Sequence, residues 1–582
     1  MNIFMEKMAG SKMGRRCWLL LLAFCWVQGA IATPQPADKA VLNHTQVMFA
    51  WDEYPGADKY QLTINGKGTG QQILVKSLAY LLTQGLSFGR QYQWSYTAIK
   101  NGKKVFQSPS YSFKVEGHPL VDTNLFRYRV SLPKPQSYQN NLIFIDHLGV
   151  AVNRQGQPVW YMPFDSFDLV GPPKYRNLQI TPSGSFTFLR GSDCVEKDIQ
   201  GQLLWTGPND GAVSLAPTEF YHHDFAKDAN GHYMVGSYQY VEMPNLKDPA
   251  VTSKVRYNTV IQYDASGKVV WQWNEKDHVR PEVVFAGAAP GEVAVPGTHW
   301  NGFSCNDKAG VCVFSFRNNS SLLVIEKATG NVLCTLEGEK AKPGGIAFAA
   351  QHSPVFLPNG DLLFYNNNVK AQPDSGQLVF PKILQLHFDK QYRSAQKVWE
   401  YECRLKDYPE GLAGKEGFAN LLPNGHILIC LGGGSKIWEV DRAKKIVWEM
   451  DTEAYDTKTQ AWKPFSNYRS HFASSLYPSF FTVQQISGKG PVKAGQNIQI
   501  KINNDGSEAD SYKVEVFSNG VFAPYEQTFR IASGASLKKT ITLKSGKTKP
   551  TASNIQQFAI VKITPIGNPG AAKDLAYEIT GR

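Results

Sequence analysis

The sequence predicts an all-β protein: a six-bladed β-propeller flanked by an N-terminal fibronectin III-like β-sandwich and a C-terminal immunoglobulin-like β-sandwich. Six similar strand endings recur in the middle of the chain, and several hairpins share one spacing between turn glycine and strand start. The composition, with 12% aromatic residues, 50 Gly and 33 Pro, is typical of turn-rich β proteins. At 582 residues the chain is too long for one ordinary domain.

Residues 1–32 are predicted to be a secretory signal peptide. Arg15 and Arg16 precede the apolar run CWLLLLAFCWV, and Ala30-Ile31-Ala32 has the small residues of a cleavage site. A lipoprotein signal through Cys25 is a weaker alternative, because bulky Phe24 stands where a small residue belongs. No later run is apolar enough to span a membrane. We therefore expect an exported protein, periplasmic or secreted.

The mature chain is mildly basic. Removing the predicted signal peptide takes away Lys7, Lys12, Arg15, Arg16 and Glu6, which lowers the formal net charge from +12 to +9. This charge fits an anionic small-molecule substrate, but an ordinary solvated surface explains it at least as well. Nucleic acid is not expected as a partner.

Six cysteines remain after the signal peptide, at positions 194, 305, 312, 334, 403 and 430. Disulfides are the usual fate of cysteines outside the cytosol. Cys305 and Cys312 flank the short stretch NDKAGV and are expected to bond across that turn. Zinc is not expected there, since no second close pair follows. The other four cysteines could form two bridges or stay buried as thiols.

Residues 33–118 are predicted to form the fibronectin III-like sandwich. The stretches FAWDEYPGADKYQLTI, RQYQWSYTAIKNG and QSPSYSFKV contain short strands with alternating apolar residues. Trp51 and Trp94 are the candidate core residues of this domain.

Residues 119–484 are predicted to form the propeller. A tight polar turn and an apolar strand recur six times, each closing on the residue at position 160, 205, 271, 334, 399 or 448, which is Trp in every case except Cys334. The endings lie 45 to 66 residues apart, so we expect long loops at 240–257 and 282–297. The segment 470–483 is expected to return and complete the first blade. An eight-bladed quinoprotein is the competing architecture, but only six endings are present.

Residues 485–582 are predicted to form the immunoglobulin-like sandwich, from the strand-rich stretches VKAGQNIQIKINNDGSEADSYKVEVFSNG and LKKTITLKSG. The run SGKT at 545–548 is not a phosphate-binding loop, because Ile541 stands where that motif needs glycine.

The hairpins of the propeller share a register. Counting eight residues back from the turn glycine of QHSPVFLPNGDLLFYNNN gives His352, and the same count in three other hairpins gives His223, Arg176 and Gly417. The strand HWNGFSCNDKAG starts at His299 with a longer turn. Inner strands of a propeller all begin at one mouth of the central channel, so we expect these side chains to meet there.

Four further residues are assigned to this mouth. Arg317, in SFRNNS, lies on the strand that returns from the cysteine-flanked turn, and Asn301 shares the face of His299 two residues earlier. His471 begins the closing strand, and Asn367 ends the strand that follows His352. Arg176, Asn301, Asn367 and His471 are the predicted substrate-binding residues.

Several histidines around one pocket indicate either a metal site or proton-transfer and nucleophilic groups around an anion. Arg317 disfavours a metal, because two positive charges in close proximity repel each other. A third interpretation is that each histidine only caps a strand end. Three histidines in register make that interpretation the weaker one. We therefore predict no metal and no cofactor.

The elements HHDFAKDANG, HWNGFSCN with SFRNNS, and QHSPVFLPNGDLLFYNNN resemble those of the nucleotide-independent arylsulfate sulfotransferase (ASST) family. The resemblance covers roughly residues 140–480 and keeps the interval of eighteen between His299 and Arg317. These are exported propeller enzymes that move a sulfuryl group from an aryl sulfate to a phenol without a nucleotide donor. Gly417 departs from the pattern, because the family can supply a polar side chain there.

The resemblance implies catalytic roles for His352, His299, His223 and Arg317. His352 would become transiently sulfated in a double-displacement reaction, and the other three, with Asn301, would hold the sulfuryl oxygens and handle the phenolic proton. Aryl sulfates and phenols would be the substrates, and a homodimer is possible. The alternatives are a non-catalytic secreted propeller that binds carbohydrate or protein, and a metal- or quinone-dependent oxidoreductase.

Overall fold

The computed structural model describes residues 34–132, 140–163, 175–279, 292–295, 297–338, 345–369, 380–405, 415–488, 490–518, 520–547 and 558–580. The predicted signal peptide lies outside these residues. Within them the regular structure is almost entirely β, with short 3-10 turns η1 (Pro119–Val121), η3 (Asp146–Leu148), η4 (Glu275–Asp277), η5 (Gly432–Gly434) and η6 (Pro569–Ala571). Within the described parts of the chain, no helix has the length and apolar character needed to cross a bilayer.

Two sheets at the N-terminus enclose one core. The larger contains β1 (Ala40–Leu42), β3 (Lys59–Gly66), β4 (Thr69–Val75), β6 (Arg90–Lys100), β7 (Lys103–Gln107) and β8 (Tyr111–Val115), and the smaller pairs β2 (Val47–Ala50) with β5 (Ala79–Leu82). The predicted core residues Trp51 and Trp94 are both buried in this core.

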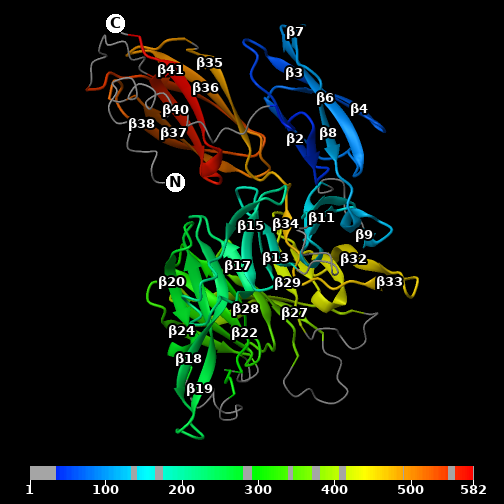
Figure 1. Cartoon of the computed structure of the whole chain (residues 1–582), viewed down its shortest axis with the longest axis vertical. Helices are drawn as coiled ribbons and strands as arrows, with labels where there is room; N and C mark the ends of the chain where they lie inside the picture. Colours follow the sequence, from blue (N-terminus) through cyan, green and yellow to red (C-terminus); the bar gives the residue numbers. More distant parts are fainter. Residues whose placement is uncertain are drawn as a thin grey trace, which may run out of the picture.

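Two sheets at the C-terminus also share a core. One contains β35 (Phe481–Ser487), β36 (Asn497–Asn504) and β39 (Ser536–Thr542). The other contains β37 (Asp510–Phe517), β38 (Tyr525–Ile531), β40 (Phe558–Pro565) and β41 (Lys573–Glu578). Both terminal units lie together beyond one end of the central sheets (Figure 1), joined by the hydrogen bond from Ser77 Oγ to Asp505 Oδ1 at 2.5 Å.

Six antiparallel sheets follow one another in the middle of the chain. The first three contain β10 (Leu142–Ile145), β11 (Val150–Asn153), β12 (Pro158–Tyr161) and β34 (Phe472–Ala473); β13 (Tyr175–Ile180), β14 (Phe186–Arg190), β15 (Asp193–Lys197) and β16 (Leu203–Thr206); and β17 (His222–Lys227), β18 (Tyr233–Pro244), β19 (Thr252–Tyr263) and β20 (Val269–Asn274). Each has four strands, which is the sheet organisation of a β-propeller.

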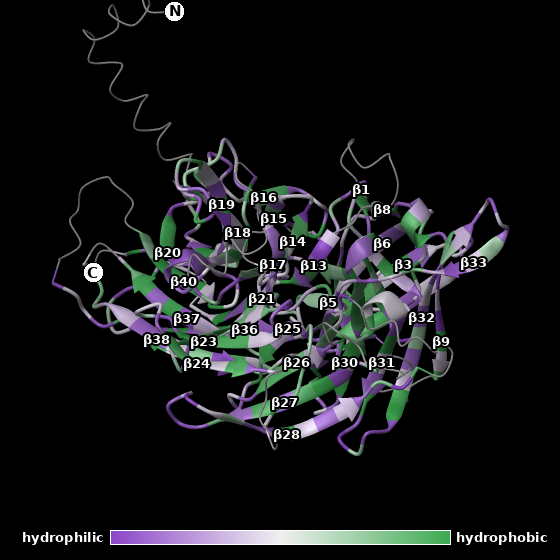
Figure 2. Cartoon of the chain, turned by 90° about the horizontal axis from the view of Figure 1, so that it is seen from below, coloured by the Kyte–Doolittle hydropathy of each residue, from purple (hydrophilic) through white to green (hydrophobic). Residues whose placement is uncertain are grey.

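The other three sheets continue this order. They contain β21 (Trp300–Asn306), β22 (Val311–Phe316), β23 (Ser321–Glu326) and β24 (Val332–Glu337); β25 (His352–Phe356), β26 (Leu362–Asn366), β27 (Lys382–Phe388) and β28 (Ala395–Glu402); and β29 (Phe418–Leu421), β30 (Ile427–Cys430), β31 (Lys436–Val440) and β32 (Ile446–Asp456). In the sixth sheet β32 also pairs with β33 (Ala461–Pro464) and β9 (Phe126–Leu132). Hydrophilic residues gather on the connecting loops (Figure 2).

The ring of sheets is closed by strands from distant parts of the chain. Ala473 pairs with Leu142 and Phe472 with Ile143, so the late strand β34 completes the first sheet. This return was expected from the sequence, although the strand is only two residues long, and β35 from Phe481 onward already belongs to the C-terminal sheets. Pairing β34 with β10 removes an open sheet edge.

The recurrent tryptophans hold neighbouring sheets together. Each closing Trp lies on the fourth strand of its sheet, counted from the inner strand. In four of the five, the indole N–H donates to a carbonyl in the turn between the third and fourth strands of the next sheet, whereas Trp205 stacks on Tyr233 of the next sheet at 3.8 Å. The hydrogen-bonded pairs are Trp160 with Ile199, Trp271 with Lys327, Trp399 with Arg442, and Trp448 with Arg154, at 2.8, 2.8, 3.4 and 2.9 Å. In these four places, turn and tryptophan recur together because the turn accepts a hydrogen bond from the tryptophan of the preceding sheet.

The contact between the sixth and first sheets is reinforced by charge. The Arg154 guanidinium lies 3.9 Å above the Trp448 ring and forms a buried ion pair with Glu439. The fourth sheet differs, since Cys334 pairs with Val324 where the corresponding strands have tryptophan.

One of the expected long loops is instead regular structure. Residues 240–257 extend β18 and β19 into a long hairpin, paired from Tyr233–Tyr263 out to Pro244–Thr252. The segment lacks the regular alternation of apolar and polar residues that is typical of a strand, so its sequence resembles that of a loop. Most of the other expected loop, 282–297, lies outside the described residues.

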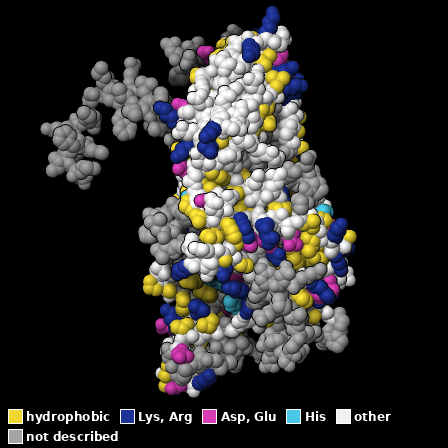
Figure 3. All heavy atoms as spheres, turned by 90° about the vertical axis from the view of Figure 1, so that its right-hand side faces the viewer, with side chains coloured by type: hydrophobic (Ala, Val, Ile, Leu, Met, Phe, Trp, Pro, Cys, Tyr) yellow, Lys and Arg dark blue, Asp and Glu magenta, His cyan; other side chains and the backbone are white. Residues whose placement is uncertain are grey.

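The terminal sandwiches and the predicted site lie at opposite ends of the inner strands. β13 runs from Arg176 to the turn at Thr181–Ser185, where the C-terminal unit makes contact through Asn568 Nδ2 and Ser183 O, 3.2 Å apart. The residues predicted to form the site are at the start of these strands, away from the sandwiches. On the face in Figure 3, basic and acidic side chains are interspersed, as expected for an ordinary solvated surface.

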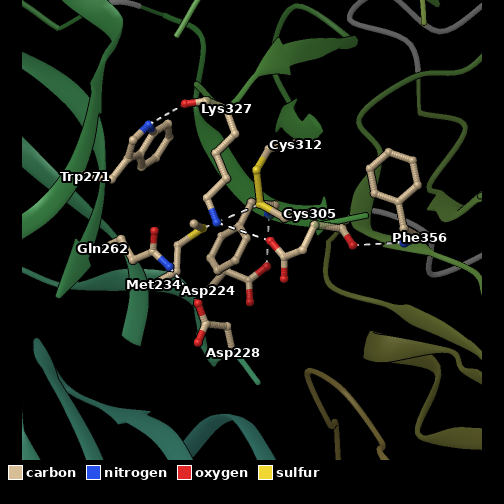
Figure 4. Close-up of a disulfide and its surroundings, with 12 residues drawn as sticks. Asp224, Asp228, Met234, Gln262, Trp271, Cys305, Cys312, Lys327 and Phe356 are labelled. Atoms are coloured by element: carbon tan, nitrogen blue, oxygen red, sulfur yellow. Dashed lines mark hydrogen bonds and ion pairs between the residues drawn. A yellow bond between two sulfur atoms is a disulfide. The ribbon is translucent and has the colours of Figure 1, made fainter. Parts of the chain in front are cut away.

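Cys305 and Cys312 form a disulfide across the β21–β22 hairpin, where they are directly paired in the ladder. Figure 4 shows the bond beside Met234 and near the Trp271–Lys327 contact. The other four cysteines among the described residues are free thiols. The bond ties together the two strands that precede Arg317.

Replacing both bonded cysteines by serine should lower the free energy of unfolding of the propeller by about 2–3 kcal/mol, because a short closed loop is released in the unfolded chain. We also expect turnover to fall, whereas the stability of the terminal sandwiches should change little. Chemical denaturation of Cys305→Ser/Cys312→Ser, with Cys334→Ser as a single-thiol control, measures the change. Equal stability of the double variant and the control, or two free thiols in non-reduced peptides, would contradict the expectation.

Candidate active site

The inner strands begin with irregular backbone. The β13, β17, β21 and β25 ladders each contain a bulge within their first residues, and Asn177, His223 and Ser353 there have φ of 56°, 60° and 53°. His299, next to β21, has φ of 53°. Left-handed backbone is unfavourable for residues other than glycine, and it concentrates at functional sites.

The eight-residue count needs one correction. In the ladders, Arg176 pairs with Leu189, His352 with Tyr365, and His222, rather than His223, with Gly236. In β17, His223 and Asp224 are both extra residues of the bulge, because His222 pairs with Gly236 and Phe225 with the adjacent Val235. The paired position that the count gave to His223 therefore belongs to His222. Both histidines nevertheless lie in the site.

His352 is buried, and its ring is held in one orientation. Its Nδ1 lies 2.7 Å from Asn367 Oδ1 and 3.1 Å from the Ala350 carbonyl oxygen. Asn367 Nδ2 donates to the Glu416 carbonyl at 3.0 Å, which orients the amide so that its oxygen faces the histidine. Both partners of Nδ1 are therefore acceptors, so Nδ1 carries the hydrogen and Nε2 the lone pair.

His352 is neutral at neutral pH. Burial is the main cause that lowers its pKa to about 3; the hydrogen bond to Asn367 opposes this shift, and the positive charge of Arg317 adds to it. A neutral imidazole with a lone pair on Nε2 is a nucleophile.

His223, His299 and Arg317 lie close to this ring. The ring centroids of His223 and His299 are 5.0 Å apart. Burial, and then the neighbouring histidines, hold the pKa of His223 well below its usual value, and burial followed by the charge of Arg317 lowers that of His299. Arg317 donates to Asn318 Oδ1 at 3.0 Å. Neutral histidines beside an arginine suit the binding of an anion.

Arg176 adds a second positive charge. It is exposed at the start of β13, and its charge lowers the pKa of His222 and of His223, after larger contributions from burial. His471 contacts the residue that follows Arg176: its Nε2 is 2.8 Å from Oδ1 of Asn177, and burial, followed by the charge of Arg469, lowers its pKa to about 3. Its described contacts are with Asn177 and Phe418, not with the histidine pair.

Asn301 is fully buried behind the histidines. Its Nδ2 donates to the carbonyl oxygen of Gln351 at 2.8 Å, and its Oδ1 has no hydrogen-bond partner among the described residues. Gln351 in turn donates to Ser315 Oγ at 3.0 Å. Asn301 thus ties β21 to the residue that precedes His352.

Gly417 has no room for a side chain. Its φ is 111°, and a Cβ atom there would lie 2.4 Å from the ring of Tyr365. The side chain of Tyr365, which is buried, fills the space where a polar side chain from the sixth sheet would stand. This explains why the sixth inner strand supplies no counterpart of His352.

Sequence reasoning missed a buried ion pair at the centre of the ring. Arg469 Nη1 and Nη2 donate to the two carboxylate oxygens of Asp224 at 2.9 and 3.1 Å. Asp224 also accepts from the backbone N–H of Phe303 at 3.1 Å and from Asn177 Nδ2 at 2.7 Å. The carboxylate compensates the Arg469 charge and joins the second, third and fourth sheets.

Tyr468 was also missed. Its ring centroid is 6.4 Å from that of His352, and burial raises its pKa to about 12. Its hydroxyl has no hydrogen-bond partner among the described residues. No local pattern marks Tyr468 or Arg469, because both stand in an irregular segment before β34.

The described residues hold no group of three or more His, Cys, Asp or Glu side chains arranged to bind a metal ion.

The buried histidines predict acid sensitivity. Burial lowers the pKa of His44, His222, His352 and His471 to about 3, against about 6.5 in an unfolded chain. The unfolded state therefore binds more protons between these values, so stability is complete above pH 6.5 and falls as the pH is lowered. Each histidine should contribute a slope of about 1.4 kcal/mol per pH unit. Denaturation between pH 5 and 7 measures this, and equal stability across that range would contradict it.

Comparison with known proteins gives one family. The model of the arylsulfotransferase (ASST) family matches residues 128–434. A search of curated proteins finds no significant match.

Solved structures give weak similarities. A protein of unknown function from Bacteroides caccae is 16% identical, with 53% of this chain and 93% of that chain covered and a TM-score of 0.33. A streptogramin B lyase is 12% identical, with 55% and 87% covered and a TM-score of 0.31. A functionally unknown protein from Desulfotomaculum acetoxidans is 10% identical, with 66% and 96% covered and a TM-score of 0.32. These TM-scores are too low to add to the assignment of fold or activity.

Proposed function

Because this chain belongs to the arylsulfotransferase (ASST) family and is an arylsulfate sulfotransferase, we propose that it transfers a sulfuryl group to a phenol by double displacement through His352. The observation that carries this proposal is the orientation of His352. Two acceptors hold its Nδ1–H, which leaves the lone pair of Nε2 beside the positive charge of Arg317.

In the first half-reaction, Nε2 of His352 attacks the sulfur of the aryl sulfate. The Nε2–S bond forms, the bond between sulfur and the phenolic oxygen breaks, and the phenolate leaves with the electron pair. Arg317 and His299 screen the negative sulfuryl oxygens, which otherwise repel a nucleophile. Asn367 keeps its hydrogen bond to Nδ1–H, so its carbonyl dipole faces the positive charge that develops on the sulfated ring.

In the second half-reaction, the phenol acceptor attacks the sulfur and the Nε2–S bond breaks. The phenolic proton passes to His223, which is neutral and able to accept it. The resulting imidazolium can then protonate the phenolate that leaves in the next cycle. Proton and sulfuryl group therefore balance over one turnover, and the reaction needs no nucleotide donor.

Arg176, Asn301, Asn367 and His471 differ in their proposed contributions. Arg176 supplies charge to the anion site, whereas Asn367 and Asn301 act on His352 by fixing its ring and the backbone before it. His471 supports the neighbouring strand through Asn177. Of these four residues, only Arg176 is therefore proposed to contact the substrate directly.

A chromogenic aryl sulfate, assayed with and without a phenol acceptor, tests the proposed function. We expect steady release of phenol only when the acceptor is present, and transfer of the sulfuryl group to it. Asn367→Leu should lower turnover by about 10²-fold, since the ring of His352 loses the partner that fixes its tautomer. Equal phenol release without acceptor, or full activity of Asn367→Leu, would contradict the proposed mechanism.

The architecture and location expected from the sequence complete this proposal. We propose that the six central sheets are the blades of one six-bladed propeller, and that the terminal units are the fibronectin III-like and immunoglobulin-like sandwiches. The disulfide supports an extracytoplasmic, periplasmic or secreted location. The homodimer stays a prediction, which sedimentation of the purified protein would test.

A further inference from the structure

His222 is a buried histidine that the proposed mechanism does not use. It starts β17, directly before His223, and its ring is enclosed by aromatic groups. The Tyr238 ring stacks on it at 4.1 Å and 21°, and the Trp300 ring meets it edge-on at 5.4 Å and 85°. These contacts leave the His222 ring one orientation.

Both nitrogens of His222 have defined partners. Nε2 lies 3.2 Å from the carbonyl oxygen of Ser237, and Nδ1 lies 2.7 Å from Nδ1 of His223. A carbonyl oxygen can only accept a hydrogen bond, so Nε2 of His222 carries the hydrogen. Burial keeps this ring neutral by lowering its pKa to about 3, so it has only one N–H group. Its Nδ1 is therefore an acceptor.

The state of His223 follows from that of His222. A hydrogen bond between the two Nδ1 atoms requires one donor, and His222 has no hydrogen to give there. His223 must donate from its own Nδ1. Since His223 is also neutral, its Nε2 carries a lone pair. The chain of hydrogen bonds thus starts at a backbone carbonyl and ends at an acceptor nitrogen in the site.

We propose that His222 is a positioning residue that fixes the Nδ1–H tautomer of His223, so that His223 presents Nε2 as the base for the acceptor phenol. The base function rests on the proposed function, whereas the tautomer does not. When the phenol attacks, its proton bonds to Nε2 of His223, and the Nδ1–H of the resulting imidazolium remains hydrogen-bonded to the lone pair of His222.

The tautomer can be measured directly. In the full-length protein labelled with ¹⁵N-histidine, long-range ¹H–¹⁵N spectra distinguish a protonated from an unprotonated ring nitrogen. The signals of His223 are assigned by their loss in His223→Asn. We expect His223 to be protonated at Nδ1 in the unaltered protein. Protonation at Nε2 would overturn the proposal, whatever the kinetics of the His222 variants.

Kinetics test whether this tautomer serves the reaction. His222→Phe keeps an aromatic ring under Tyr238 but removes the acceptor, whereas the side-chain oxygen of His222→Asn can take the place of Nδ1. We expect His222→Phe to slow discharge of the sulfated enzyme by phenol about 10²-fold, with a much smaller effect on the phenolate burst. His222→Asn should recover most of this loss.

His232→Asn, on the same hairpin, is the control for loss of a histidine outside the site. Discharge by His222→Phe at the rate of the unaltered enzyme would overturn the positioning role. A missing burst in the unaltered enzyme would instead overturn the proposed function, and the ¹⁵N spectra would still decide the tautomer.

Discussion

His352→Asn should lose both the phenolate burst and turnover, by at least about 10⁴-fold, because an amide can fill the space but cannot accept a sulfuryl group. The unaltered enzyme, mixed with an aryl sulfate and no acceptor, should release about one phenolate per active site and then stall. Stopped-flow absorbance with a chromogenic donor measures burst and steady state together.

The His352→Asn result depends on a folded variant. The amide nitrogen of the new side chain can still donate to Oδ1 of Asn367, so we expect little change in the unfolding transition. His387→Asn is the matched control, because that histidine is half-exposed and pairs with Asp361 on the outer part of the same sheet, at 2.7 Å. A burst retained by His352→Asn would remove His352 from the mechanism.

Arg317→Lys should lower kcat/KM by about 10²-fold or more. A lysine keeps the charge but cannot reproduce the planar fork that donates to two sulfuryl oxygens at once. Because the interaction strengthens as the leaving oxygen departs, kcat should fall more than KM rises. Steady-state kinetics separates the two. Arg393→Lys, at an exposed position of the fifth sheet, is the control. A change confined to KM would show that Arg317 only binds the donor.

The sequence was sufficient for much of the inner-strand register. Turn glycines such as Gly360 and Gly231, with φ of 88° and 84°, set where each hairpin folds back. Counting from them placed His352 correctly. The count failed by one position at His223, because the β17 bulge adds residues that a regular spacing cannot reveal.

Long-range partners could not be predicted. Asp224 and Arg469 are 245 residues apart. In the sequence, Asp224 is simply a polar residue near the start of a strand, and nothing near it indicates that its partner is a distant arginine. The function of the recurrent tryptophans was missed for the same reason. The repeat predicted strands, but the carbonyl that accepts from the indole of Trp160, Trp271, Trp399 or Trp448 belongs to the next sheet. Local sequence therefore defined elements and candidate residues, whereas contacts between sheets required the structure.

The location of the trapped sulfuryl group tests the central claim most directly. The enzyme is mixed with an aryl sulfate without acceptor, digested at mildly alkaline pH, and the modified peptide is fragmented in a mass spectrometer. We predict one sulfuryl group on His352, lost on acidification and discharged by added phenol. Its absence, or a label on another residue such as His223, would contradict the assignment of His352 as the nucleophile.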